Sequence, residues 1–172
     1  LILEGPKEEL DLTANTQPAI FLISYSIFNI AKNEFKLDLS KAKYFAGHSL
    51  GEYSALSCAG YLDFSDTLKI LRIRGDAMQN SVKNVETRMV AVIGLELEII
   101  EDLLRNFKEE KEFLCEIAND NCPGQVILSG FRKSIDEFSE ILKSSGARSI
   151  IDLQVSAPFH CSLMKPAADV MS

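Results

Sequence analysis

Residues 47–51 read Gly-His-Ser-Leu-Gly, which fits the Gly-x-Ser-x-Gly pattern around a nucleophilic serine. An apolar run, 44–46, precedes the pattern, and a stretch expected to be helical, 52–59, follows it, so Ser49 is predicted on a sharp strand-to-helix turn. We expect both flanking glycines to be required, because only hydrogen fits beside such a turn. The first amides of the helix would point at the serine, and the Leu50 amide would receive an oxyanion. The pattern indicates attack on a carbonyl; the alternative is an ordinary glycine-bounded turn.

A serine hydroxyl needs a general base near neutral pH, and the chain contains two histidines, His48 and His160. His48 adjoins Ser49, and neighbouring side chains on such a turn diverge. His160 ends the segment 156–160, Ser-Ala-Pro-Phe-His, in a predicted loop after the last strand, a position suited to a catalytic group. His160 is therefore the candidate base; the alternative is a histidine that only packs beside proline and phenylalanine.

Arg74 lies on the flank of an apolar helix stripe, with Ile70 and Met78 one turn to either side. A buried guanidinium without a partner is costly, so we expect an anion beside it. That anion is either an internal carboxylate or a ligand carboxylate held by the guanidinium fork. In the second case the serine would transfer an acyl group that carries a free carboxylate, and malonyl is the smallest such thioester.

The first part of the chain is expected to hold a largely apolar, buried helix over 20–30. Thr16 is its expected N-cap, with Pro18 in the first turn. The expected strand 44–46 and helix 52–59 follow, and then a helix over 66–82 capped by Ser65.

After residue 84 the expected order of strands and helices is different from that of the first part. The expected elements of this second part follow the order β-α-β-β-α-β, which is typical of a ferredoxin-like fold. The predicted strands are 89–93, 113–118, 126–128 and 149–155, and the predicted helices are 96–107 and 131–145.

Composition excludes several classes of protein. The 172 residues carry a formal net charge of −7, which argues against nonspecific nucleic-acid binding. The most apolar stretch, 18–31, is too short and too interrupted to span a bilayer. Four cysteines without a Cys-x-x-Cys pair, and two histidines, offer no zinc ligand set and suggest inert thiols in a reducing cytosol.

Five spaced segments together resemble the malonyl-CoA:acyl carrier protein transacylase family of type II fatty-acid synthesis. They are 15–20, 47–56, 72–75, 119–126, and 158–161 with 163–166. The resemblance covers essentially the whole chain in the same order. It implies an α/β fold in which an α/β-hydrolase-like acyltransferase core, residues 1–85 and 157–172, is interrupted by a ferredoxin-like subdomain, residues 86–156.

The resemblance also implies roles for individual residues. Ser49 would be the acylated nucleophile, His160 its base and Arg74 the clamp on the malonyl carboxylate. The Leu50 amide would form half of the oxyanion hole, and Phe159 is expected to narrow the pocket against a 2-methyl branch. The residues that would line the cleft between the subdomains are Gln17, Asn119, Asn121 and Gln125; alternatively, these polar groups satisfy turns and backbone groups.

Two family features are missing from the sequence. One is the Gly-Gln-Gly-Ser-Gln type strand end that supplies the other oxyanion amide, and the other is the continuation past Ser172 that orients the base histidine. Asp152 is the nearest carboxylate that could replace the orienting group. We therefore expect a chain truncated at both ends, which folds poorly and is nearly inactive in isolation.

The implied activity is that of an [acyl-carrier-protein] S-malonyltransferase. A malonyl group would pass from malonyl-CoA through a malonyl-serine to the phosphopantetheine thiol of holo acyl carrier protein, in fatty-acid biosynthesis. The expected enzyme is a cytoplasmic monomer without cofactor or metal, bound to neither membrane nor nucleic acid. A basic patch for the acidic carrier would draw on Lys32, Lys36, Lys41, Lys43, Arg132 and Lys133.

Three alternatives remain open at this point. The chain could be the acyltransferase domain of a polyketide synthase or other modular synthase. It could be an α/β-hydrolase-type esterase or thioesterase with water as acceptor, or a noncatalytic scaffold that binds carrier protein or coenzyme A.

Overall fold

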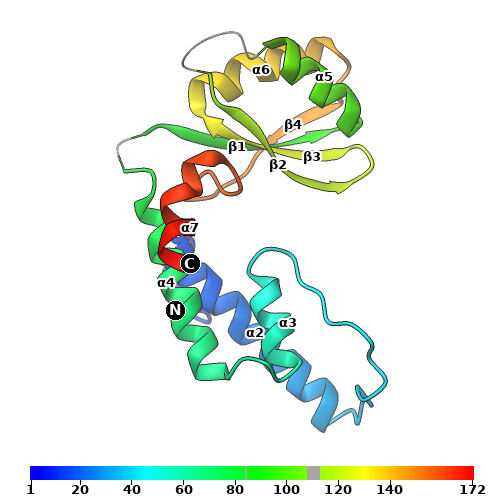
Figure 1. Ribbon diagram of the computed structural model, residues 1–172, viewed down its shortest axis with the longest axis vertical. Coiled ribbons are helices and arrows are strands. Elements are labelled where there is room, and N and C mark those ends of the chain that lie inside the picture. The colour runs from blue at the N-terminus through cyan, green and yellow to red at the C-terminus, as the bar shows by residue number, and fades with distance from the viewer. Residues whose placement is uncertain (84, 108–112) are drawn as a thin grey trace. The chain divides into compact units, whose positions relative to one another are not determined.

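The structure, a computed structural model, describes residues 1–83, 85–107 and 113–172. The chain divides into two compact units (Figure 1): Leu1–Ala77 with Met171, and Met78–Val170 with Ser172. The domain boundaries expected from the sequence, at 85/86 and 156/157, stay a prediction.

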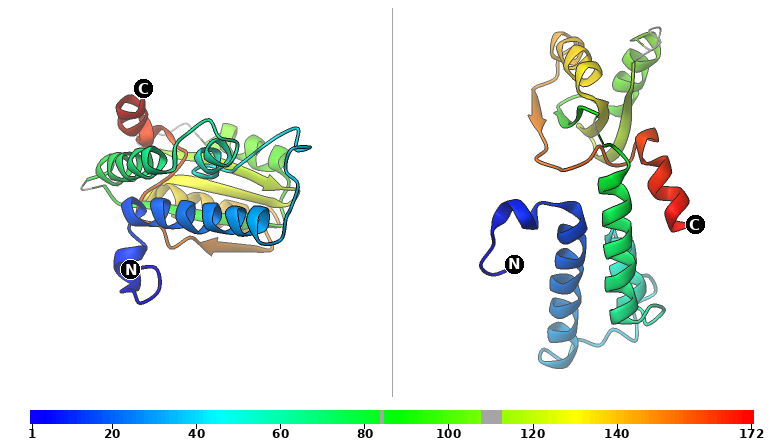
Figure 2. Two further views of the ribbon diagram at one scale, coloured as in Figure 1. Left: turned by 90° about the horizontal axis from the view of Figure 1, so that it is seen from below. Right: turned by 90° about the vertical axis from the view of Figure 1, so that its left-hand side faces the viewer.

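The first unit is helical over its described residues. Its elements are α1 (Lys7–Leu10), α2 (Thr13–Asn33), α3 (Gly51–Cys58) and the greater part of α4 (Phe64–Asn80). Helices α2 and α4 run side by side (Figure 2), so close that a Cβ on Gly75 would lie 2.5 Å from the Ala14 Cα. Further along the pair, the Phe64 ring of α4 stacks at tilted angles on Phe21 and Tyr25 of α2.

Helix α2 begins at Thr13, so the predicted N-cap at Thr16 is wrong. Pro18 lies inside the helix and has no amide to donate to the Ala14 carbonyl. The Arg72 Nη1 donates to that carbonyl instead, at 3.3 Å. A contact from the neighbouring helix thus replaces part of the hydrogen bonding that the proline removes, and α2 starts a turn earlier than its sequence indicates.

The expectation that α2 is well buried is also wrong. Among its apolar residues only Ala14 and Phe21 are buried. Five large apolar side chains are between 37% and 62% exposed: Ile20, Leu22, Ile23, Ile27 and Ile30. Apolar content predicted burial on all sides, whereas packing within this unit covers only part of the helix.

Two more local predictions for the first unit are corrected. Residues 44–46 are extended but form no strand, because a strand needs a hydrogen-bonded neighbour and the described part of this unit contains no strand. Helix α4 is capped by Asp63 rather than Ser65: the Asp63 Oδ1 accepts from the amides of Ser65 (2.7 Å) and Asp66 (3.3 Å).

The second unit contains a four-stranded antiparallel sheet in the order β2-β3-β1-β4. Its elements are β1 (Thr87–Ile93), α5 (Leu97–Phe107), β2 (Cys115–Cys122), β3 (Gln125–Phe131), α6 (Arg132–Ser144), β4 (Ser149–Asp152), the 3-10 helix η1 (Ser162–Met164) and α7 (Lys165–Met171). Helices α5 and α6 lie on the same face of the sheet (Figure 1). This order and connection confirm the ferredoxin-like prediction.

Alternation along β1 explains how both faces of this sheet are used. Val90 and Val92 point into the core beneath α5 and α6. Met89 and Ala91 point to the opposite face, where they cluster with Ile127 of β3. Phe159, from the loop that follows β4, packs against this second cluster, so that loop is seated on the face of the sheet that the helices leave open.

Candidate active site

Ser49 occupies a left-handed backbone conformation, with φ of 53°. A non-glycine residue in this region stores strain of about 1–3 kcal/mol and marks a functional turn in many proteins. A Cβ on Gly47 would lie 1.9 Å from the Gly51 carbonyl oxygen, so residue 47 must be glycine. The parallel expectation for Gly51 is wrong, since no described atom beyond its chain neighbours and its own helix backbone lies within 4 Å of where its Cβ would be.

The turn around Ser49 is closed by backbone hydrogen bonds. The Gly51 amide donates to the His48 carbonyl at 2.8 Å, and the Glu52 amide donates to the Ser49 carbonyl at 3.1 Å. Leu50 is the N-cap of α3, where amides have no partner within the helix. Its amide directly follows Ser49, which is the local position expected of an oxyanion donor if Ser49 is the nucleophile.

Arg74 contacts the serine directly. Its Nη2 donates to the Ser49 Oγ at 3.2 Å, and its Nη1 donates to the Gln17 Oε1. The guanidinium also lies over the Tyr53 ring, 5.8 Å from the centroid. Within the described part of the chain, no carboxylate pairs with Arg74, so the internal acid considered as an alternative is not found there.

Electrostatically, Arg74 is a half-buried cation whose direct hydrogen-bond partners, Gln17 and Ser49, are neutral. Burial lowers the pKa of Arg74, and Tyr53 and Glu52 act in the opposite direction. A guanidinium remains protonated under such shifts. It therefore presents a positive charge next to the serine hydroxyl, with hydrogen-bond donors suited to a carboxylate.

Gln17 is held in place for this contact. It is only 3% exposed, and its Nε2 donates to the Thr13 Oγ1 at 2.9 Å, which leaves its carbonyl oxygen facing Arg74. Three separate segments, in α2, before α3 and in α4, thus bring Gln17, Ser49 and Arg74 together. Sequence reasoning missed Tyr53, although its spacing of four residues from Ser49 was the available signal.

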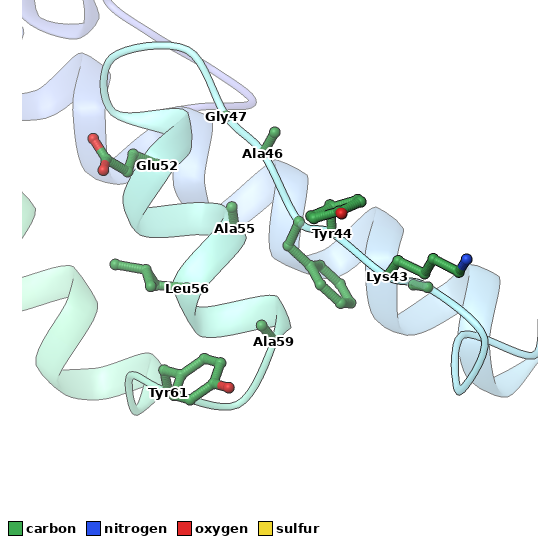
Figure 3. Close-up of a pocket in the computed structure, with 11 residues that line it drawn as sticks. Lys43, Tyr44, Ala46, Gly47, Glu52, Ala55, Leu56, Ala59 and Tyr61 are labelled. Atoms are coloured by element: carbon green, nitrogen blue, oxygen red, sulfur yellow. The ribbon is translucent and has the colours of Figure 1, made fainter.

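A hollow of about 620 Å³ adjoins Ser49 between α2 and α3. Ile20, Ile27 and Phe28 give its α2 side an apolar character. A different hollow, of about 730 Å³, lies between residues 42–47 and the other flank of α3 (Figure 3). Its lining includes Gly47 and Glu52 but not Ser49, so of these two hollows only the one beside α2 adjoins the serine.

The second unit carries His160. This residue is exposed, has a left-handed φ of 57°, and lines a hollow of about 740 Å³ together with Glu116 and Cys161. Burial raises the pKa of the Cys161 thiol, which keeps it protonated and unreactive near neutral pH. Because Ser49 and His160 belong to different units, their pairing stays a prediction.

Phe159 has a place in the structure that the sequence did not suggest. Its amide donates to the Met89 Sδ at 3.1 Å, and its ring packs on the cluster of Met89, Ala91 and Ile127. The ring thus helps to seat the loop on the sheet. A role in excluding a 2-methyl branch stays a prediction.

The remaining polar candidates lie in the hairpin of β2 and β3. The Asn121 Nδ2 donates to the Gln125 Oε1 at 3.2 Å, and Asn119 stands opposite Ile127 in the ladder. The structural alternative, polar groups that satisfy a turn, accounts for the pair Asn121 and Gln125. Contact of these residues with substrate stays a prediction.

Asp152 is engaged by Arg88, whose Nε and Nη2 donate to its two carboxylate oxygens at 2.6 and 2.7 Å. These hydrogen bonds lower the pKa of Asp152. The bidentate pair accounts for this carboxylate and argues against its use as the group that orients His160.

The described residues contain neither a cluster suited to a metal ion nor a helix suited to a membrane. No group of three or more His, Cys, Asp or Glu among them is arranged to hold a metal ion. None of the helices formed by these residues has the length and apolar character needed to cross a membrane.

Residues 1–172 match the family described as acyl transferase domain. The chain belongs to this family.

The similar curated proteins are malonyl-CoA–acyl carrier protein transacylases. The one from Haemophilus influenzae is 42% identical over 172 residues, which cover 100% of this chain and 54% of that protein. The one from Bacillus subtilis is 43% identical over 169 residues, covering 98% of this chain and 52% of that protein. The chain thus spans about half the length of these relatives.

Solved structures of the same kind confirm the fold class. The acyl-carrier-protein S-malonyltransferase of Bartonella henselae is 45% identical with a TM-score of 0.88, covering 97% of this chain and 52% of that one. A malonyl-transacylase solved with a type II polyketide synthase acyl carrier protein is 38% identical, with a TM-score of 0.88 and coverage of 98% and 53%. The chain therefore has the mixed α/β fold of a malonyltransferase.

Proposed function

We propose that this chain provides the nucleophile, the carboxylate clamp and the base of an enzyme that transfers malonyl groups from coenzyme A to an acyl carrier protein. The observation that supports this proposal best is the contact of Arg74 with Ser49 and Gln17. An esterase that uses water as the acceptor needs no cation beside the nucleophile. An enzyme whose acyl group carries a free carboxylate needs a cation to bind that carboxylate.

The geometry of the first unit indicates how the substrate is held. In malonyl-CoA one methylene separates the carboxylate from the thioester carbonyl, so both groups must be bound within a few ångströms. Arg74 reaches the Ser49 Oγ at 3.2 Å and is steadied by Gln17. When the malonyl carboxylate binds the guanidinium, it takes over the hydrogen bonds that Arg74 donates to Ser49 and Gln17, and the serine is released for attack.

The reaction then proceeds in two halves. His160 takes the proton of the Ser49 hydroxyl as the oxygen attacks the thioester carbonyl, and the Leu50 amide stabilises the oxyanion. Collapse breaks the carbon–sulfur bond, His160 returns the proton to the leaving coenzyme A thiolate, and a malonyl-serine ester remains. The phosphopantetheine thiol of the carrier protein reverses these steps, with His160 again as the base.

Acetyl-CoA binds poorly in this scheme, since it leaves the half-buried guanidinium without an anion. A site built to pair with a polar group rejects an analogue that lacks it much more strongly than an apolar pocket rejects a missing methylene. Selectivity for malonyl over acetyl is therefore assigned to Arg74.

The proposal is tested by incubating the protein, in its full natural length, with malonyl-CoA and measuring its intact mass. We expect a stable increase by one malonyl group that is lost when holo acyl carrier protein is added. Ser49→Ala should show no increase, whereas Ser57→Ala, a serine of α3 that lies away from the turn, should retain it. A wild-type protein that hydrolyses malonyl-CoA without passing it to a carrier would instead be a thioesterase.

A second candidate acceptor is a carrier protein of a type II polyketide synthase, because one similar structure is a malonyl-transacylase bound to such a carrier. The serine chemistry is the same for both acceptors. Parallel transfer assays with the two kinds of holo carrier protein would distinguish them by the ratio of kcat/KM.

A further inference from the structure

The backbone at His160 requires support from its surroundings. Its φ of 57° places it in the left-handed region, which non-glycine residues adopt rarely and at a cost in free energy. Such a conformation persists only where neighbouring contacts hold it. The contacts of the His160 loop, residues 156–162, therefore decide where the imidazole lies.

One anchor of the His160 loop precedes the histidine. The Phe159 amide donates to the Met89 Sδ of β1 at 3.1 Å, and the Phe159 ring packs on the open face of the sheet. Thioether sulfur is a weak hydrogen-bond acceptor, so packing of the Phe159 ring contributes most of the stabilisation of the loop before His160.

A second anchor follows the histidine and is stronger than the Met89 contact. The Glu116 Oε2, from β2, accepts a hydrogen bond from the Ser162 amide at 2.5 Å. Hydrogen bonds from a backbone amide to a carboxylate are about twice as strong as bonds between neutral groups. Among the described residues Glu116 has no cation within salt-bridge distance, and Arg105, which lines the same hollow, pairs with Asp102. The amide of the His160 loop is thus the partner of this carboxylate.

We propose that Glu116 is a positioning residue for His160, holding the far side of the loop to β2 through the Ser162 amide. The proposal rests on the proposed function, in which His160 is the general base. Glu116 touches no reacting atom in this scheme. Its role depends first on reach, because the acceptor oxygen must extend from β2 to the loop, and the charge adds strength to that hydrogen bond.

Paired variants separate reach from charge. Glu116→Gln keeps an oxygen acceptor at the same distance without the charge, whereas Glu116→Asp keeps the charge on a shorter side chain. We expect Glu116→Gln to retain malonyl loading within about threefold of wild type and Glu116→Asp to lose about tenfold to a hundredfold, as displaced catalytic groups do. The loss should appear in the rate at saturating malonyl-CoA, with KM unchanged, because the clamp is untouched.

The control variant is Glu101→Ala, which removes a carboxylate from the same hollow without contacting the loop amide. It should load malonyl at the wild-type rate. The measurements are single-turnover malonyl loading of the full-length protein and its thermal unfolding temperature. If Glu116→Ala fails to fold, the order of the Gln and Asp variants still decides the question.

The outcomes are distinct for the two proposals. A wild-type protein that takes up no malonyl group, or a His160→Ala variant as fast as wild type, would overturn the proposed function and the positioning role that depends on it. If His160→Ala is inactive while Glu116→Asp loads within twofold of wild type, or while Glu116→Gln is slower than Glu116→Asp, only the positioning role is overturned.

Discussion

The contact between Arg74 and Ser49 gives the protein a cation next to its proposed nucleophile. The two side chains come from different segments, and the only other polar side chain that Arg74 contacts directly among the described residues is the neutral Gln17, apart from the Tyr53 ring beneath it. A carboxylate that binds there replaces bonds to neutral groups with a charged pair, which strengthens the interaction.

Arg74→Ala should therefore lower kcat/KM for malonyl-CoA by about tenfold to a hundredfold, as expected from a lost charged hydrogen bond of about 1.5–3 kcal/mol. Transfer of acetyl should fall much less, so the malonyl-to-acetyl ratio drops. Lys69→Ala is the matched control, because Lys69 lies on the same helix, is exposed and pairs with Asp66 of that helix. An unchanged ratio in Arg74→Ala would contradict the clamp.

At the scale of elements, the turn before α3 depends on the close approach of Gly47 to Gly51. In Gly47→Ala the new methyl group would overlap the Gly51 carbonyl, so the turn must open. We expect a loss of about 1–3 kcal/mol in the free energy of unfolding, as in other overpacked sites, and slower malonyl loading.

Gly51→Ala is the natural comparison for this variant, because its methyl group meets no described atom and its backbone is helical. It should keep or raise the free energy of unfolding, by up to about 1 kcal/mol. Equal destabilisation of both variants in urea unfolding would show that the turn is not held as described.

In the second unit, an ion-pair network connects strand β1 to strand β4 and to helix α6. Arg88 on β1 binds Asp152 of β4 at 2.6 Å and also pairs with Asp136 of α6. The pKa of Asp152 is lowered below its ordinary value of 3.8, so this stabilisation is present above about pH 4 and is lost as the pH falls through the lowered pKa.

Arg88→Met should lower the free energy of unfolding at pH 7 by about 1 kcal/mol or less, because half-exposed pairs are screened by solvent. The difference from wild type should shrink when thermal unfolding is repeated near pH 3. Arg105→Met, which breaks only an exposed pair with Asp102 on α5, should have a smaller effect at either pH. If the stability difference between Arg88→Met and wild type grew as the pH falls, the stabilising effect of the lowered Asp152 pKa would be contradicted.

Across the whole molecule, apolar burial is uneven. The core under α5 and α6 contains eleven buried residues among those that the structure describes, including Val90 and Leu128, whereas the buried residues of α3 are the serines Ser54 and Ser57. The hydroxyl groups of both serines are buried without a hydrogen-bond partner among the described residues. Regions with few buried apolar contacts open more readily.

Hydrogen exchange measured by mass spectrometry should reflect this difference. We expect the slowest amide exchange in β1 and β3 and exchange at least tenfold faster in α3, because opening α3 exposes little apolar surface. Peptides from α3 that exchange as slowly as those from β1 would show that unit 1 is more stable than its packing indicates. Adding malonyl-CoA should slow exchange in α3 if the acyl group binds beside it.

Much of this protein could be read from its sequence, because period and spacing are local properties of a chain. A strand over 89–93 was predicted, and β1 contains it; the order of six predicted strands and helices predicted the ferredoxin-like unit. The Gly-x-Ser-x-Gly spacing predicted a sharp turn at Ser49, and its φ of 53° agrees with that prediction.

Only the tertiary structure decided which groups meet across long stretches of sequence. The start of α2 depended on a bond from Arg72, and the extended segment 44–46 became no strand because pairing requires a neighbour. The approach of Arg74 to Ser49 and the hydrogen bond from Ser162 to Glu116 join residues 25 and 46 positions apart. Local propensity cannot encode such contacts, since the packing of whole helices and strands brings them together.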